Sequence, residues 1–181
     1  TDRTQLATSA LRLPARSIDV SPSVDSSRVV ARPLLRWAGG KQQILRLILD
    51  RIKQPGADGR YVEPFLGAAS VFLAMAPRGA IIAALNYQLV DCYEQLVGSP
   101  AAVARELRAL TVDWISERDY YSTRSIYNRA KPSAAQAARF IFLNRTCFNG
   151  IFRVNTKGEF NVPFGNKVAP HVPTRAHLLQ V

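Results

Sequence analysis

The stretch that decides the fold is Arg60–Ser70, which reads RYVEPFLGAAS. Residues 60–65 are predicted to form a strand, and residues 68–76 a helix that stops at Pro77. A strand that runs into a loop of small residues and then a helix is typical of ligand binding at the carboxyl end of a parallel strand. The spacing is not the GxGxxG fingerprint, so a simple packing turn between strand and helix remains the alternative.

The alternation of strand and helix continues on both sides of this stretch. Upstream, the short apolar run Leu34–Ala38 is closed by two glycines, and Lys41–Lys53 has helical periodicity. Downstream, a second strand is predicted at Ala80–Leu85 and a helix at Tyr87–Val97. This order implies a parallel sheet with right-handed crossovers, which is a Rossmann-like α/β arrangement.

After Pro100 the strand pattern stops and helices follow. They are predicted at Ala101–Leu110, from Ser116 onward, and at Ser133–Leu143, with Ser133 as the N-cap. The runs Phe152–Asn155 and Glu159–Val162 then flank a short turn that contains glycine, which predicts a β-hairpin.

The run Trp37-Ala38-Gly39-Gly40-Lys41 is the first candidate binding element. Two glycines at a strand-to-helix junction allow backbone N–H groups to approach an anionic ligand. Lys41 adds a positive charge, and Trp37 offers an aromatic face. A flexible turn before the helix is the alternative interpretation.

The second candidate surface is the polar and aromatic segment Phe142–Gly165. Between Arg139 and Arg175 there are six basic residues and one acidic residue, and the aromatic residues alternate with Asn and Arg. Asn and Arg read base edges, Lys and Arg hold phosphates, and aromatic rings stack on bases. The pattern favours nucleic-acid recognition over a hairpin that only serves the core.

Composition narrows the function further. The formal net charge is +11, which suits a polyanionic partner, although a solvated basic surface gives the same value. Two cysteines and two histidines without a cluster predict free thiols and no metal site. No apolar run reaches the ~18 residues that a membrane span needs, so we expect no membrane contact. With a polyanionic partner, we expect a cytoplasmic, nucleoid-associated protein. The sequence leaves the oligomeric state open.

Taken in this order, the motifs resemble those of the Dam-type DNA adenine methyltransferase family over roughly residues 32–175. The resemblance implies S-adenosylmethionine as the cofactor. It also implies that two segments hold this cofactor. Their matching positions are Trp37, Gly39, Gly40, Lys41, Glu63, Pro64, Phe65 and Gly67.

The same resemblance implies double-stranded DNA as the partner, with the target adenine flipped out of the stack. Phe148 matches an aromatic residue that inserts into the duplex, and Arg36 matches a basic residue that reaches a guanine. The expected DNA contacts are Arg36, Asn144, Arg145, Phe148, Asn149, Ile151, Arg153, Pro163 and Lys167.

The sequence departs from the family pattern at three places. Ala69 stands where a further glycine is usual, and we expect its methyl group to crowd the cofactor. Ala84 stands where an Asp bonds the cofactor ribose. The catalytic Asp-Pro-Pro-Tyr tetrapeptide is absent, since no two prolines are adjacent. We therefore expect an incomplete or degenerate copy without a catalytic residue of its own. The alternatives are a non-catalytic DNA-binding protein and, on charge alone, an RNA-binding module.

The expected organisation has four parts. Residues 1–31 form a flexible lead-in, for which an Arg/Ser-rich transit peptide is a minor alternative. Residues 32–100 form the cofactor-binding part of a partial Rossmann-like sheet, and residues 101–175 an inserted helical and β-hairpin DNA-recognition subdomain. Residues 176–181 are a truncated end.

Overall fold

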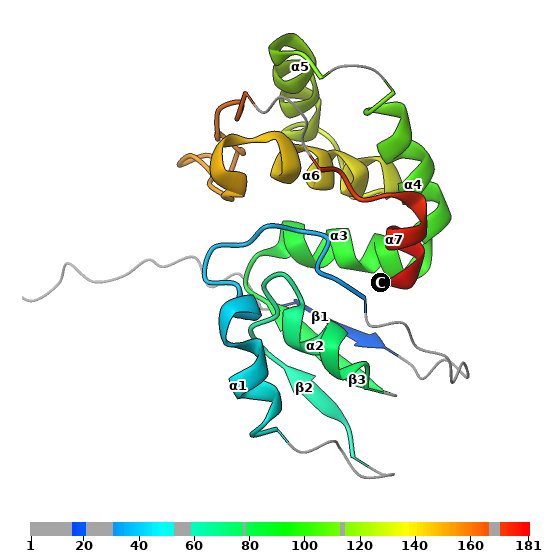
Figure 1. The fold of residues 1–181 in the computed structure, drawn as a ribbon. Coiled ribbons are helices and arrows are strands. Elements are labelled where there is room, and N and C mark those ends of the chain that lie inside the picture. Colours follow the sequence, from blue (N-terminus) through cyan, green and yellow to red (C-terminus); the bar gives the residue numbers. More distant parts are fainter. Residues whose placement is uncertain (1–15, 21–30, 53–58, 78, 113–114, 167–170) are drawn as a thin grey trace, which may run out of the picture.

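A small mixed sheet organises the first half of the chain in this computed structural model (Figure 1), which describes residues 16–20, 31–52, 59–77, 79–112, 115–166 and 171–181. Strands β2 (Tyr61–Glu63) and β3 (Ala80–Ala84) are parallel, as the sequence predicts. Strand β1 (Arg16–Val20) lies on the other side of β3 and is antiparallel to it, so that the strand order is β1-β3-β2.

Strand β1 corrects two expectations. The flexible lead-in proposed for residues 1–31 is wrong for Arg16–Val20, and the sheet is mixed rather than purely parallel. Ser17 is exposed and Ile18 is buried, in the alternation that a half-buried strand requires. Five residues are too few for this period to stand out in a Ser- and Arg-rich segment. Ala31, the last residue of the lead-in, is buried, and the other residues of the lead-in lie outside the described part of the chain.

Two short helices and one longer helix surround the sheet. Residues Lys41–Ile44 form a 3-10 turn (η1) that leads into α1 (Leu45–Leu49). Helix α2 (Ser70–Met75) follows β2, and α3 (Tyr87–Gly98) follows β3. The helix predicted over Lys41–Lys53 is therefore shorter and partly 3-10, because its N-cap Gly40 provides no side-chain cap and none of its residues is buried.

The apolar run before these helices is not a strand. Residues 31–40 are irregular, and the predicted strand-to-helix junction at Gly39-Gly40 is a turn. Leu34 and Leu35 are nevertheless buried. The backbone around them is bound by side chains of a distant helix, as described below, rather than by a neighbouring strand.

The second half of the chain is helical. It contains α4 (Pro100–Ala109), α5 (Glu117–Tyr127), α6 (Ala134–Thr146) and α7 (Arg175–Gln180). Helix α6 is apolar on most sides and contacts α3, α4 and α5, so it forms the centre of this layer. In Figure 1, α3 lies between the sheet and α6, and segment 31–40 also passes between the sheet and α6.

In the segment 176–181, expected to be a truncated end, residues 176–180 belong to α7 and Val181 follows the helix. Leu178 is 1% exposed, and the helix packs on α4. Thr174 caps the helix by accepting a hydrogen bond from the backbone N–H of His177 (3.3 Å). No helix among the described residues is long and apolar enough to cross a membrane.

The predicted hairpin is present in a reduced form. Two isolated antiparallel bridges, Cys147–Phe164 and Val154–Phe160, replace the two paired strands. Asn155 closes the turn between Val154 and Phe160. Its side-chain oxygen accepts hydrogen bonds from the backbone N–H groups of Lys157 (2.9 Å) and Glu159 (3.0 Å). We refer to residues 147–166 as the recognition loop, after the role that the sequence analysis expects of them.

Candidate functional site

A cleft of about 390 Å³ opens at the carboxyl ends of β2 and β3. Three segments that are far apart in the sequence meet there: the Trp37–Lys41 turn, the Phe65–Ser70 loop, and the residues that follow β3. This is the position at which parallel α/β sheets bind ligands. The lining residues are Trp37, Ala38, Gly39, Gly40, Lys41, Phe65, Leu66, Gly67, Ala68, Ser70, Ala84, Leu85, Asn86 and Leu89.

Lys41 and Glu63 form the polar support of this cleft. The Lys41 ammonium donates to Glu63 Oε1 (3.1 Å) and to the carbonyl oxygen of Phe65. Glu63 Oε2 accepts from the Tyr61 hydroxyl (3.0 Å) and from the backbone N–H of Phe72 (3.1 Å). Burial, followed by the Glu63 charge, raises the pKa of Tyr61, so this hydroxyl remains a donor.

Of the eight predicted cofactor positions, six line the cleft: Trp37, Gly39, Gly40, Lys41, Phe65 and Gly67. Glu63 and Pro64 do not. Glu63 is 5% exposed and lies behind Lys41, where it fixes the loop from within. Pro64 is exposed beside the cleft. The structure therefore assigns Glu63 a supporting position.

The backbone of Gly67 favours glycine, because its φ of +54° lies in the left-handed region. A Cβ atom there would make an ordinary van der Waals contact with Cδ1 of Trp37 (3.5 Å), so the two loops lie side by side. The Trp37 ring stacks on Phe152 of the recognition loop, with ring centroids 5.5 Å apart, and on Phe140 of α6 at 6.3 Å. Trp37 thus touches the cleft, the helical layer and the recognition loop.

The two substituted alanines differ in their surroundings. Ala84 lines the cleft at the end of β3, where a side-chain carboxylate would face a bound ligand. Ala69 does not line it. Its methyl group is fully buried and its backbone has φ +59°, so the departure from glycine strains the backbone rather than crowding the cleft.

Most of the predicted DNA-contacting side chains lie together at one edge of the helical layer. Arg36, Asn149, Arg153 and Pro163 are exposed, Phe148 is 51% exposed, and Ile151 is half-buried. Arg153 is held across the recognition loop, where its Nε donates to Asn161 Oδ1 (2.8 Å). Asn149 is exposed and has φ +53°, which turns the backbone sharply between Phe148 and Gly150. Lys167 lies outside the described residues.

Asn144 and Arg145 occupy different positions from the other predicted contacts. Asn144 is 3% exposed and its amide is bound to backbone groups of Arg36 and Gly150. Arg145 Nε donates to the carbonyl oxygen of Leu34 (2.6 Å), and its NH2 group to that of Pro33 (3.2 Å). Burial lowers the pKa of Arg145. Both side chains bind segment 31–40 to the end of α6.

Sequence reasoning missed the residues that hold the recognition loop against α5. The Tyr120 hydroxyl (2.8 Å) and Arg124 NH1 (2.9 Å) both donate to the carbonyl oxygen of Val162. Asn128 pairs with the N–H and C=O of Phe160 at 2.9 and 3.1 Å. The three residues are four positions apart, so their common helix face was a signal that could have found them.

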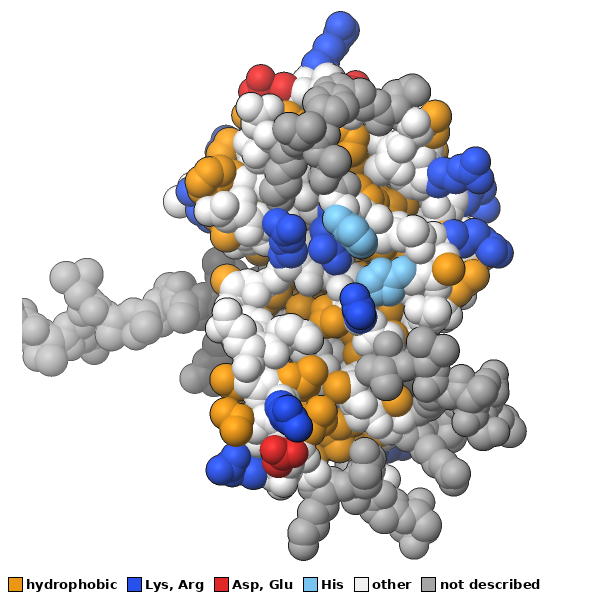
Figure 2. Space-filling model, viewed as in Figure 1, with side chains coloured by type: hydrophobic (Ala, Val, Ile, Leu, Met, Phe, Trp, Pro, Cys, Tyr) orange, Lys and Arg blue, Asp and Glu red, His pale blue; other side chains and the backbone are white. Residues whose placement is uncertain are grey.

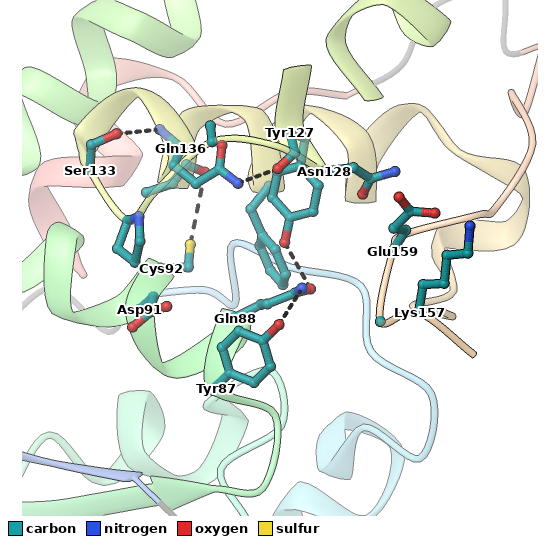
Figure 3. A pocket seen from close by; sticks show the side chains of 15 residues that line it. Tyr87, Gln88, Asp91, Cys92, Tyr127, Asn128, Ser133, Gln136, Lys157 and Glu159 are labelled. Carbon is teal, nitrogen blue, oxygen red and sulfur yellow. Dashed lines mark hydrogen bonds between the residues drawn. The ribbon is translucent and has the colours of Figure 1, made fainter. Parts of the chain in front are cut away.

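A second, smaller cavity of about 190 Å³ lies between α3, α6 and the tip of the recognition loop. Figure 3 shows the Tyr127 hydroxyl donating to Gln88 Oε1 (3.0 Å) and Gln136 Nε2 donating to the carbonyl oxygen of Tyr127 (2.7 Å). Lys157 and Glu159 stand on the other side of the opening. These bonds fix α5 against α3 and α6.

The described residues contain no group of three or more His, Cys, Asp or Glu side chains that could hold a metal ion. Cys92 and Cys147 are both buried, and neither forms a disulfide bond. Burial raises the pKa of the Cys92 thiol, so it is a neutral core group. Basic side chains surround the two histidines on the face in Figure 2, whereas acidic side chains are few there.

The cleft at the ends of two parallel strands gives the chain the architecture of α/β proteins, in which ligand sites lie at that edge of the sheet. Comparison with known proteins gives the family. The model of the D12 class N6 adenine-specific DNA methyltransferase family matches residues 37–178. The chain therefore belongs to this family, as the motifs indicate.

Curated relatives agree with this assignment. The chain is 34% identical to the type II methyltransferase M.MjaIII of Methanocaldococcus jannaschii, over 83% of this chain and 57% of that protein. It is 37% identical to the DNA adenine methylases of Serratia marcescens and Escherichia coli (strain K12). Each of these matches covers 78% of this chain, and 52% and 50% of the relative. The chain spans about half the length of the curated relatives it matches.

Proposed function

We propose that this chain supplies the cofactor cleft and the DNA-recognition surface for S-adenosylmethionine-dependent methylation of adenine N6 in double-stranded DNA. One observation carries the proposal. The Trp37–Lys41 turn, the Phe65–Ser70 loop and the end of β3 are separate in the sequence but line a single cleft.

The residues of the cleft fit the cofactor. The volume of the cleft, about 390 Å³, is within the range of roughly 300–1,000 Å³ that is usual for small-molecule sites. Phe65 is 77% exposed at its rim and offers an aromatic face. The glycine turns at Gly39 and Gly67 let backbone N–H groups approach a ligand. When bound, S-adenosylmethionine supplies the electrophilic methyl group.

The chain's own residues bind and orient rather than transfer protons. Lys41, fixed by Glu63, holds the Phe65 loop in place, and Ser70 and Asn86 add polar groups to the cleft wall. On the DNA side, the exposed Arg153 is braced for a base contact, and Phe148 projects where it can enter a base stack. Because DNA is the proposed partner, we expect the protein to be associated with the nucleoid.

A second candidate is a DNA-binding protein without catalysis. The alanine at position 84, where the family pattern has the Asp that bonds the cofactor ribose, favours it. Both candidates require the recognition loop, and only the first requires methyl transfer. Binding of the cofactor, binding of DNA and turnover therefore have to be measured separately.

Titration calorimetry with S-adenosylmethionine tests the cleft. We expect weak but measurable binding by the chain, which Lys41→Gln weakens at least tenfold because the Phe65 loop loses its support. Arg46→Gln, a change at an exposed residue that does not line the cleft, serves as the control and leaves affinity unchanged. Equal affinity in both variants contradicts the assignment of the cleft.

Incubation with tritiated S-adenosylmethionine and duplex DNA that contains GATC tests turnover. We expect no incorporation by the chain alone, because orientation of the adenine amino group supplies several kcal/mol of the lowering of the barrier and the tetrapeptide that would hold this group is absent from the sequence. Escherichia coli DNA adenine methylase is the positive control. Incorporation above background overturns this expectation.

A further inference from the structure

The side chain of Asn144 joins the two halves of the proposed site. Its Oδ1 accepts from the backbone N–H of Arg36 (2.8 Å), and its Nδ2 donates to the carbonyl oxygen of the same residue (2.7 Å). Nδ2 also approaches the carbonyl oxygen of Gly150 (3.3 Å). A buried amide with three backbone partners has a single favourable position, because moving it would leave buried polar groups unpaired.

The residues on the two sides of this clamp belong to different sites. Arg36 is exposed on the DNA-facing side, and the next residue, Trp37, lines the cofactor cleft. The Arg36 side chain lies directly on the recognition loop: a Cβ atom at Gly150 would lie 2.6 Å from Arg36 Cδ. Gly150, with φ +66°, therefore brings the loop into contact with Arg36 in a way that no larger residue permits.

A second contact runs in parallel with the clamp. The Trp37 ring stacks on Phe152, two residues beyond Gly150, and its edge faces Gly67 of the cleft. A displacement of the recognition loop would therefore move Arg36 through the clamp and Trp37 through the stack. Close-packed contacts of this kind transmit small shifts, because packed side chains change between discrete arrangements instead of deforming continuously.

We propose that Asn144 is a positioning residue through which DNA at the recognition loop and S-adenosylmethionine in the cleft raise each other's affinity. The proposal rests on the proposed function, because it requires both ligands to bind. It assigns Asn144, which sequence analysis expected to touch DNA, to the connection between the sites. The effect is reciprocal, since coupling between two binding equilibria has one value.

Trp37 provides the readout. The sequence has two tryptophans, so Trp114→Phe leaves Trp37 as the sole indole. We titrate S-adenosylmethionine by the fluorescence of Trp37, with and without a saturating short duplex that contains GATC. We expect DNA to increase the affinity for the cofactor by about fivefold or more, and to change the Trp37 emission before any cofactor is added.

The variants separate coupling from stability. Asn144→Leu removes the clamp and should reduce the effect of DNA on cofactor affinity to less than about twofold, with each ligand still binding when alone. Thr146→Val is the matched control on the same helix: the Thr146 hydroxyl is fully buried and donates only within the helix, to the carbonyl oxygen of Phe142 (2.7 Å). It should retain the full effect. If Asn144→Leu does not fold, Phe152→Leu removes the parallel stack and should weaken the effect alone.

Three outcomes decide the matter. Loss of the DNA effect in Asn144→Leu or Phe152→Leu, with its retention in Thr146→Val, supports the proposal. If the parent binds both ligands without mutual effect, the coupling is refuted, and if Asn144→Leu and Phe152→Leu keep the effect, the role of Asn144 is refuted; in both cases the proposed function stands. If the parent binds neither ligand, the proposed function fails, and the coupling with it.

Discussion

Ala69 shows at the scale of one residue how a departure from the family sequence is absorbed. It has φ +59°, is fully buried, and precedes α2 as its N-cap. A left-handed backbone disfavours any residue with a Cβ atom by roughly 1–2 kcal/mol. Ala69 therefore has the backbone conformation that glycine favours, and its backbone is strained.

Ala69→Gly tests this strain against a matched neighbour. Both Ala68 and Ala69 are buried, but only Ala69 has a positive φ. Each change to glycine loses a buried methyl group and adds freedom to the unfolded chain, so these two terms cancel in the comparison. We expect Ala69→Gly to be more stable than Ala68→Gly by about 1–2 kcal/mol in urea unfolding. Equal stabilities would show that the backbone is not strained.

Ala84→Asp should restore a missing contact to the cofactor. Ala84 lines the cleft, and a carboxylate there can accept a charge-assisted hydrogen bond worth about 1.5–3 kcal/mol. Titration calorimetry should therefore give at least tenfold tighter binding of S-adenosylmethionine. Ala83→Asp adds the same charge at the next position, which points to the opposite face of the strand, and should bring no gain. A similar gain in both variants would reduce the effect to general electrostatics.

Single residues also mark the limit of sequence reasoning. The resemblance identified Asn144 and Arg145 as DNA contacts, because polar residues next to an aromatic and basic loop look alike in a sequence. Burial separates them from Arg153, and burial depends on segment 31–40, which is more than a hundred positions away. No local pattern contains that information.

Helix α5 shows what a local pattern does contain. Ser116 and Asp119 form a capping box: Ser116 Oγ accepts from the backbone N–H of Asp119 (3.1 Å), and Asp119 Oδ2 accepts from that of Ser116 (3.1 Å). The hydrogen bonds from Ser116 hold the pKa of the Asp119 carboxyl below its usual value. These contacts were predictable because they depend on a spacing of three residues.

Ser116→Ala should therefore destabilise the protein by about 1 kcal/mol near neutral pH. The folded pKa of Asp119 is lowered, so its contribution is present above the unfolded pKa of about 3.9 and is lost as the pH falls through the folded pKa. The difference between parent and variant should accordingly shrink in acid, and the pKa of Asp119 should rise in the variant. Urea unfolding at two pH values and NMR titration measure both. Ser122→Ala, at an exposed position within the helix, is the control and should have little effect.

The recognition loop allows two basic residues of the same element to be compared. Arg153 is braced by Asn161, whereas Lys157 stands exposed at the tip. A bidentate guanine contact contributes about 1–3 kcal/mol of discrimination. Arg153→Ala should therefore flatten the preference between cognate and scrambled duplexes, while Lys157→Ala should weaken binding to both equally. Fluorescence anisotropy distinguishes the two, and identical behaviour would mean that the loop is only a basic surface.

The helix starts agree with the sequence prediction where a capping residue fixes them. Element boundaries differ from the prediction where tertiary packing decides them. Asn86, Ser116 and Ser133 each accept a backbone hydrogen bond at a helix start. The hairpin, in contrast, is reduced to isolated bridges. Its two segments are joined by backbone bonds from Asn155 N–H to the Glu159 carbonyl oxygen (2.9 Å) and from Asn161 N–H to the Arg153 carbonyl oxygen (3.1 Å). The carbonyl groups of Val162 and Phe160 face the other way, where the side chains of Tyr120 and Asn128 bind them.

At the scale of the whole molecule, the net charge of +11 predicts how DNA binding responds to salt. If two to four phosphates are neutralised, log K should fall with log salt at a slope between about −1.8 and −3.6. Anisotropy titrations at several salt concentrations measure this slope. A slope near zero would exclude the basic surface as the source of DNA affinity. The cofactor affinity, measured in the same buffers, should change much less.

The assembly of the cleft is the molecular feature that the sequence predicted best. The Phe65–Ser70 loop and the end of β3 meet at one sheet edge because β2 and β3 are parallel. The Trp37–Lys41 turn, which follows no strand, reaches the same cleft from an irregular segment. The connection between the cleft and the recognition loop was not predictable, since it consists of one asparagine, one glycine and a ring stack that no periodicity marks.

Strand β1 also sets an order of events during synthesis. Ile18 pairs with Ile82, so β1 leaves the ribosome roughly 60 residues before its partner. At translation rates of ~5–20 residues per second, it waits about 3–12 s without a strand to pair with. The parallel pair β2–β3 and the helix between them are complete at almost the same moment as β3 itself. We therefore expect the sheet to begin from its centre, with the earliest-made strand as the last to be added.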